Sequence, residues 1–245
     1  MKSRLFSQCR LYALDCVSAA KFSFERVRLI DVPSPFKAIT IDPWAVNKSL
    51  EPSRFVRSGR YRLSGQVFRG TWDRIIPLPE KHHLLAEAFR ARFVRQTAEF
   101  SRMLAKYSDG ADAYLQLERF IGSVPFDLYA QMFSSFRQTG FRAPGFGASR
   151  YDPFFICIDE DGAFLFTTGK HRLALAKAAG LKTIEARVSA RHISWVRYRK
   201  DLRGRLKAGE LSGLDMERRD HPDLQDIFGT DYGRAALQRS GSERP

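Results

Sequence analysis

Four consecutive residues, Gly169-Lys170-His171-Arg172, combine the residue types that bind a phosphate group. A glycine lets a ligand approach the backbone closely. Lys170 and Arg172 add two cations, and an arginine can clamp a phosphate with two hydrogen bonds. His171 could orient a phosphate or take part in proton transfer, which makes it the catalytic candidate. Together with Thr168, which precedes them, these residues predict a phosphate-binding turn.

The residues around this turn predict the strands and the helix that would position it. In chain order the sequence predicts a strand at 154–158, a turn at 159–162, a strand at 163–166, a break at 167–169, a helix at 170–179 capped by Gly180, and a strand at 183–188. The turn therefore falls where a strand ends and a helix begins. Backbone N–H groups at a helix N-terminus point outward without helical partners, and the helix dipole favours an anion there.

This pattern resembles the ParB/sulfiredoxin-like superfamily. The resemblance rests on Thr168-Gly169-Lys170-His171-Arg172-Leu173-Ala174, on the alanine-rich helix after it, and on Gly180-Leu181-Lys182-Thr183-Ile184. It covers roughly residues 150–195, with a weaker match at Lys37 to Trp44, which could be the family's opening strand. In that superfamily a G-x-x-R or G-x-H-R turn at a helix start holds the phosphates of a nucleotide. The resemblance implies an α/β or α+β fold, with a small mixed sheet of ParB/sulfiredoxin-like type and added helices.

The resemblance implies a ligand but no single reaction. Sulfiredoxins carry a reactive cysteine where this chain has Lys170, so their sulfur chemistry is not expected here. Partition proteins carry an arginine where this chain has His171, and no helix-turn-helix pattern follows the core. Free serine kinases and ParB-like nucleases remain as relatives. The expected ligand is a nucleoside triphosphate, ATP or CTP, with Mg²⁺, for which Asp159, Glu160 and Asp161 are candidate ligands.

Composition indicates a polyanionic partner. The 245-residue chain has a formal net charge of +14, and its pI is about 10.0. Such a charge suits a nucleic acid, a nucleotide or an acidic membrane surface, although a basic pI can also serve solubility alone. The three cysteines form no CxxC or Cys/His cluster, which favours a reducing, cytoplasmic location and argues against structural zinc. No stretch approaches the ~20 apolar residues of a membrane span.

Positive charge is densest at residues 187–207, where eight cations face only Asp201. Trp195 and Tyr198 lie among them, as in a nucleic-acid groove. A solvated helix face explains the pattern equally well. The candidate nucleic-acid contacts are Arg187, Arg191, Arg197, Arg199, Arg203 and Arg205. Five further arginines lie in residues 54–70, which are expected to form a half-exposed strand pair or a lid-like loop.

The remaining segments predict one core with extensions at both ends. Residues 1–30 are expected to form a helical extension that packs on the core, with a membrane-surface or partner helix as the alternative. Residues 31–200 are expected to form the ParB-like core, with helices inserted at about 80–138, namely at 80–107, 111–122 and 125–138. Residues 201–245 form a C-terminal extension that contains a docking segment at 221–228 and ends in disorder from residue 238.

Three functions follow from these patterns. The first is an enzyme that uses or hydrolyses a nucleotide, such as an NTP-dependent phosphotransferase or an NTPase. The second is a nucleic-acid-binding module without catalysis, in which the same turn grips a backbone phosphate. The third is a nuclease, which requires an acidic metal cluster that the sequence does not identify.

Overall fold

The computed structural model describes ten parts of the chain. They are residues 16–17, 19–20, 33–34, 37–50, 66–68, 75–78, 86–87, 89, 126–141 and 154–242. The expected helix at 111–122 lies outside them. So do most of the N-terminal extension, of the 54–70 segment and of the expected helix at 80–107.

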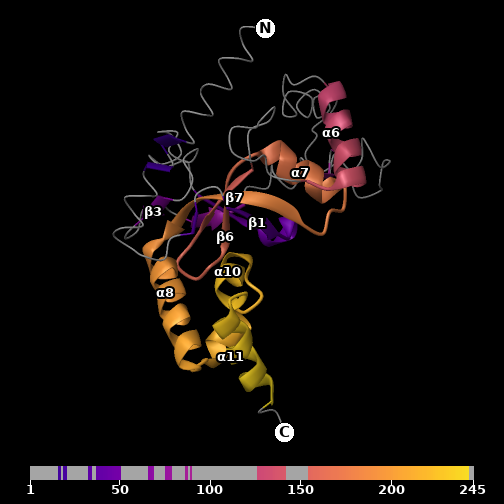
Figure 1. The fold of residues 1–245 in the computed structure, drawn as a ribbon. Coiled ribbons are helices and arrows are strands. Elements are labelled where there is room, and N and C mark those ends of the chain that lie inside the picture. Colours follow the sequence, from indigo (N-terminus) through magenta and orange to yellow (C-terminus); the bar gives the residue numbers. More distant parts are fainter. Residues whose placement is uncertain are drawn as a thin grey trace.

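The described strands form one mixed sheet of seven strands, so the α/β fold is confirmed (Figure 1). Its order is β1-β7-β5-β6-β2-β4, and β3 also pairs with β7. The strands are β1 (Ala38–Ile41), β2 (Lys48–Leu50), β3 (Gln66–Phe68), β4 (Ile75–Pro77), β5 (Phe155–Ile158), β6 (Phe164–Thr168) and β7 (Ile184–His192). Within the predicted strand at Lys37 to Trp44, Ala38–Ile41 form β1, which lies antiparallel to the first half of β7, whereas Trp44 belongs to a 3₁₀ turn.

β7 pairs with three other strands of the sheet, β1, β3 and β5. One of its edges pairs with β1 at Ile184–Arg187 and then with β3 at Ala190–His192, while its other edge pairs in parallel with β5. β5 and β6 form the predicted antiparallel hairpin. All four residues of β5 are buried, which explains its continuous apolar sequence, because a strand covered on both faces does not alternate.

The helices flank this sheet. They are α6 (Phe126–Thr139), α7 (Lys170–Ala178), α8 (Ile193–Ala208), α9 (Gly213–Glu217), α10 (Gln225–Phe228) and α11 (Asp231–Ser242), with 3₁₀ turns η1 (Pro43–Ala45) and η3 (Pro222–Leu224). In the view of Figure 1, α6 and α7 lie above the sheet, whereas α8, α10 and α11 extend below it. The predicted helices at 125–138 and 170–179 are confirmed. None of the helices in the described ranges is long and apolar enough to cross a membrane.

The C-terminal residues are part of the fold rather than a loose extension. Leu224, Ile227 and Phe228 of the predicted docking segment are buried in the hydrophobic core. α8 crosses the expected boundary at residue 200 without a break. Residues 238–242, the first part of the segment expected to be disordered, lie at the end of α11. α11 packs on α8, and its Ala236 is buried.

Candidate functional site

The predicted phosphate-binding turn lies at the joint between β6 and α7. β6 ends at Thr168, and α7 begins at Lys170. Gly169, between them, has φ 93° and ψ 33°, a left-handed conformation that favours glycine. A Cβ on Gly169 would lie 2.9 Å from Cδ2 of Phe154. The fold therefore requires glycine here for its backbone and its packing, so the glycine by itself does not indicate a ligand.

The start of α7 is strongly electropositive. No side chain caps this N-terminus within the described residues, and the first turn contains no acidic residue. Instead, the first turn carries Lys170 and Arg172, although cations are unfavourable at the positive end of a helix dipole. Thr168 and all four turn residues are partly exposed. The structure thus brings the five predicted site residues together at one partly exposed surface beside the N-terminus of α7.

His171 is the most perturbed group of this turn. Burial lowers its pKa to about 4, and the neighbouring charges of Lys170 and Arg172 act in the same direction. The imidazole is therefore neutral at pH 7. Its Nε2 atom is shielded from solvent and has no hydrogen-bond partner in the described part of the chain. A buried polar nitrogen without a partner costs free energy, and an anion or hydroxyl at this position would supply the missing hydrogen bond.

Tyr129 of α6 completes the surroundings of His171. The two rings lie 5.1 Å apart between centroids. Burial raises the pKa of the Tyr129 hydroxyl, and the charge of Arg172 opposes this shift only in part. The sequence predicted α6 as a helix but did not connect Tyr129 with the turn, because the pairing depends on how α6 packs on α7. No local pattern could have revealed it.

The acidic residues expected to bind Mg²⁺ lie at the wrong end of the hairpin. Asp159, Glu160 and Asp161 form the turn beyond Ile158 and Phe164, whereas Gly169 follows the opposite end, where Phe155 pairs with Thr168. A strand of four or five residues separates the two ends by about 15 Å. Asp159 is buried and accepts hydrogen bonds from the backbone N–H groups of Asp161 and Ala163, at 3.0 and 2.7 Å. Asp159 is therefore a turn-forming residue, and these three residues cannot hold a metal at the α7 turn.

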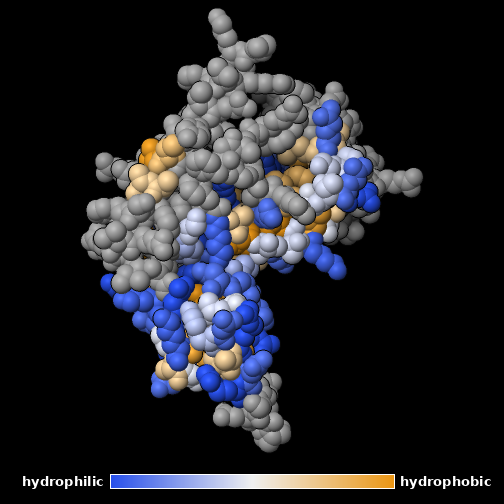
Figure 2. Space-filling view, viewed as in Figure 1, coloured by the Kyte–Doolittle hydropathy of each residue, from blue (hydrophilic) through white to orange (hydrophobic). Residues whose placement is uncertain are grey.

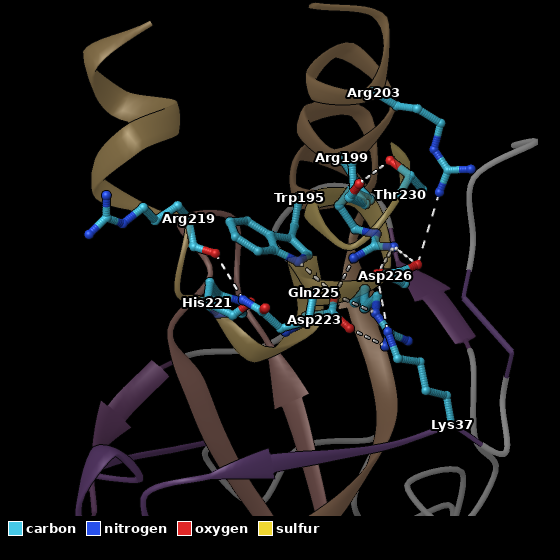
Figure 3. Close-up of polar contacts among 12 residues, drawn as sticks. Lys37, Trp195, Arg199, Arg203, Arg219, His221, Asp223, Gln225, Asp226 and Thr230 are labelled. Carbon is cyan, nitrogen blue, oxygen red and sulfur yellow. Dashed lines mark hydrogen bonds and ion pairs between the residues drawn. The ribbon is translucent and has the colours of Figure 1, made fainter. Parts of the chain in front are cut away.

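The predicted nucleic-acid contacts at Arg191 and Arg199 are wrong, because both side chains are inside the protein. Arg191 is 1% exposed and Arg199 is 0% exposed. Both pair with buried Asp223. Arg199 also pairs with Asp226 (Figure 3). The indole N–H of Trp195 donates to Asp223 at 2.9 Å, so this tryptophan is not a surface for stacking bases. We call Arg191, Trp195, Arg199 and Asp223 the buried arginine cluster.

Two more of the predicted contacts are engaged in ion pairs at the side of α8. Arg205 donates two hydrogen bonds to Asp215, at 2.9 and 2.7 Å, and Tyr198 donates a third. Although burial opposes it, this set of donors lowers the pKa of Asp215 to about 2. Arg203 lies 4.0 Å from Asp226. Arg187 is buried in β7. Among the six predicted contacts, Arg197 alone is fully surface-exposed.

Two further residues near the sheet have structural roles. His192 is the N-cap of α8 and accepts a hydrogen bond from the Ser194 N–H. Cys157 is fully buried in β5.

Comparison with known proteins gives no match to any family model, to any curated protein or to any solved structure. The functional reading of this chain therefore depends on its own residues and on the motif at the start of α7.

Proposed function

We propose that this protein is a ParB-like α/β protein that binds a nucleoside triphosphate, ATP or CTP, through its phosphates at the start of α7. One observation carries the proposal. Two cations lie in the first turn of α7, next to a solvent-shielded imidazole nitrogen that has no partner among the described residues. The unpartnered nitrogen costs free energy, and a phosphate group would supply its hydrogen bond while interacting favourably with the helix N-terminus and both cations.

Each residue of the turn has a distinct part in this proposal. The backbone N–H groups after Gly169 point at a phosphate oxygen, and Lys170 and Arg172 neutralise its charge. Neutral His171 donates or accepts one hydrogen bond through Nε2. Mg²⁺, when bound with the nucleotide, would neutralise phosphate charge. No group of three or more potential metal ligands occurs among the described residues, so no step is assigned to the metal.

The proposed activity is that of an NTPase or an NTP-dependent phosphotransferase, with His171 as the group that moves a proton. A pKa of about 4 in the free protein leaves the imidazole unprotonated at pH 7 and able to accept a proton. Phosphate charge beside it would raise this pKa toward neutrality, where a proton-transfer group works best. A nucleotide-binding module without turnover is the alternative, and turnover measurements separate the two.

The experiment is equilibrium binding of ATP and CTP, with and without Mg²⁺. Arg172→Gln is expected to weaken nucleotide binding about 10–100-fold, the effect of losing a charged partner at a half-buried site. Lys182→Gln is the matched control, because Lys182 is an exposed cation beyond the other end of α7, and it should bind normally. In parallel, NMR titration of His171 should show its pKa rising when nucleotide is added. Equal affinity of the two variants and an unmoved His171 pKa would refute the proposal.

A further inference from the structure

The outward side of α8 is a second basic surface, separate from the α7 turn. Arg197, Lys200, Gly204 and Lys207 are all exposed. Their spacing of three or four residues puts them in one row along the helix. We call these four residues the α8 row. It spans about 15 Å at 1.5 Å per residue. Figure 2 has the same view as Figure 1, and hydrophilic residues cover the lower part of the molecule where Figure 1 shows α8.

Among the described residues, the cations of the α8 row form no ion pairs with carboxylates. On the inward and lateral sides of α8, Arg199 forms ion pairs with Asp223 and Asp226, and Arg205 forms one with Asp215. Within the described ranges, no carboxylate lies in ion-pair distance of Arg197 or Lys200, although Asp201 belongs to the same helix. The ammonium group of Lys207 lies 5.7 Å from the centroid of the Tyr232 ring. The structure therefore divides the cations of α8 into a neutralised inner set and an available outer row.

Gly204 is the second observation that points to a partner. A glycine inside a helix costs about 0.5–1 kcal/mol relative to alanine. A Cβ at Gly204 would meet no atom within 4 Å. Neither its backbone nor its packing therefore requires glycine, in contrast to Gly169. Its lack of a side chain leaves the helix backbone uncovered between Lys200 and Lys207, which allows a bulky anionic partner to lie close.

We propose that the α8 row binds the phosphate backbone of double-stranded nucleic acid without reading its sequence. One strand of a duplex carries a phosphate about every 3.4 Å along the axis, so the α8 row matches about four phosphates. The aromatic residues of α8 do not contribute stacking surfaces, because Trp195 is fully buried and Tyr198 packs against it. Binding to single strands depends on such surfaces, so the duplex is the better fit. β3, which pairs with the residues just before α8, belongs to the arginine-rich segment 54–70. This proposal does not depend on nucleotide binding at α7.

The test is duplex DNA binding by the full chain, measured by fluorescence anisotropy at several KCl concentrations. The variant Arg197→Gln/Lys200→Gln/Lys207→Gln is expected to lose about 10–100-fold in affinity near physiological salt. Its log–log salt slope should flatten by about 2–3, at about 0.9 per lost phosphate contact. The matched control is Arg219→Gln/Arg234→Gln/Arg239→Gln, which removes the same charge from exposed residues elsewhere. ATP binding should be unchanged in both.

A charge-neutral variant tests the close approach at Gly204. Gly204→Gln should weaken duplex binding while the salt slope stays as in the wild type, because bulk is added and no cation is lost. Three results would overturn the proposal: no salt-dependent duplex binding, an equal loss in the control variant, or tighter binding to single strands or to phosphatidylserine vesicles than to duplex. Unfolding curves of every variant show whether a loss of binding reflects a loss of structure.

Discussion

Replacing Asp223 by Asn tests the buried arginine cluster, which joins the C-terminal residues to the sheet. Asp223 is 0% exposed. It accepts hydrogen bonds from Arg191 at 2.9 and 2.6 Å and from the Trp195 indole at 2.9 Å, and Arg199 lies 3.4 Å away. Burial alone would raise the pKa of Asp223, but the two guanidinium groups outweigh burial and hold the pKa well below its usual range. The carboxylate is therefore charged at all ordinary pH values.

The expected loss follows from the burial of the partners. Asn has nearly the shape of Asp, so packing is preserved, but the change removes the charge and replaces one acceptor oxygen with an N–H donor that faces the donors of Arg191 or Trp195. Arg191 then keeps a buried positive charge without its carboxylate, a situation that costs about 3–5 kcal/mol. This is a large part of the 5–15 kcal/mol typical of a domain. For a urea m-value near 2 kcal/mol/M, the midpoint should fall by about 2 M.

Urea unfolding followed by circular dichroism measures this loss, with Asp231→Asn as the control. Asp231 also pairs with an arginine, Arg234, but its side chain is 98% exposed, so its loss should cost less than about 1 kcal/mol. A cost below about 1 kcal/mol for Asp223→Asn as well would refute the idea that the buried charges depend on one carboxylate. The double variant Arg191→Met/Asp223→Leu should recover part of the stability, since it removes both charges of the closest pair.

Three further predictions concern the α7 turn and the thiols. Gly169→Ala should lower the free energy of unfolding by at least about 1–2 kcal/mol, because a left-handed backbone is strained for alanine and its Cβ would meet Phe154. A fall in melting temperature no larger than that of Gly204→Ala would contradict this prediction. His171 should make the protein less stable as pH falls from about 6.5 to about 4, because the unfolded state takes up the proton before the folded state does. After allowance for partial exposure, the free energy of unfolding should fall by about 1–2 kcal/mol over this pH range. Urea titrations of His171→Gln should therefore show a shallower pH dependence than those of the wild type. Burial also lowers the pKa of His221, which contributes equally to the pH dependence of both proteins. Replacing all three cysteines with Ser or Ala should leave nucleotide affinity unchanged in a variant shown to be folded, and a large loss would indicate a thiol-dependent mechanism instead.

The local pattern was sufficient to predict the hairpin, the turn and α7. Turn residues, helix formers and a capping glycine all act within a few positions, so residues 154–188 could be read directly. The chemistry of the arginines could not be read this way. Arg191, Arg197 and Arg199 look alike in sequence, yet two are buried against Asp223 and one is exposed. Asp223 lies far along the chain from Arg191, and only the packing of η3 under β7 and α8 brings the two charges together.

The role of Tyr129 and the failure of the expected metal ligands have the same origin. Tyr129 lies beside His171 because α6 packs on α7. Asp159 is far from Gly169 because an antiparallel hairpin separates its turn from its open end. Short-range patterns thus predicted which elements form and where the turn at the start of α7 lies. Which side chains surround that turn depends on contacts between distant segments.

The dependence of Arg191 and Arg199 on Asp223 has a consequence for synthesis on the ribosome. Translation delivers β7 and α8 before residue 223, so both guanidinium groups and the Trp195 indole leave the ribosome before their common carboxylate can reach them. Until η3 arrives, closing the core would bury two unpaired charges, which is strongly unfavourable. The nascent sheet should therefore stay open, with apolar β5 and β7 exposed, until the segment 221–228 docks. During this interval the exposed strands are open to aggregation, which the docking of the segment 221–228 ends.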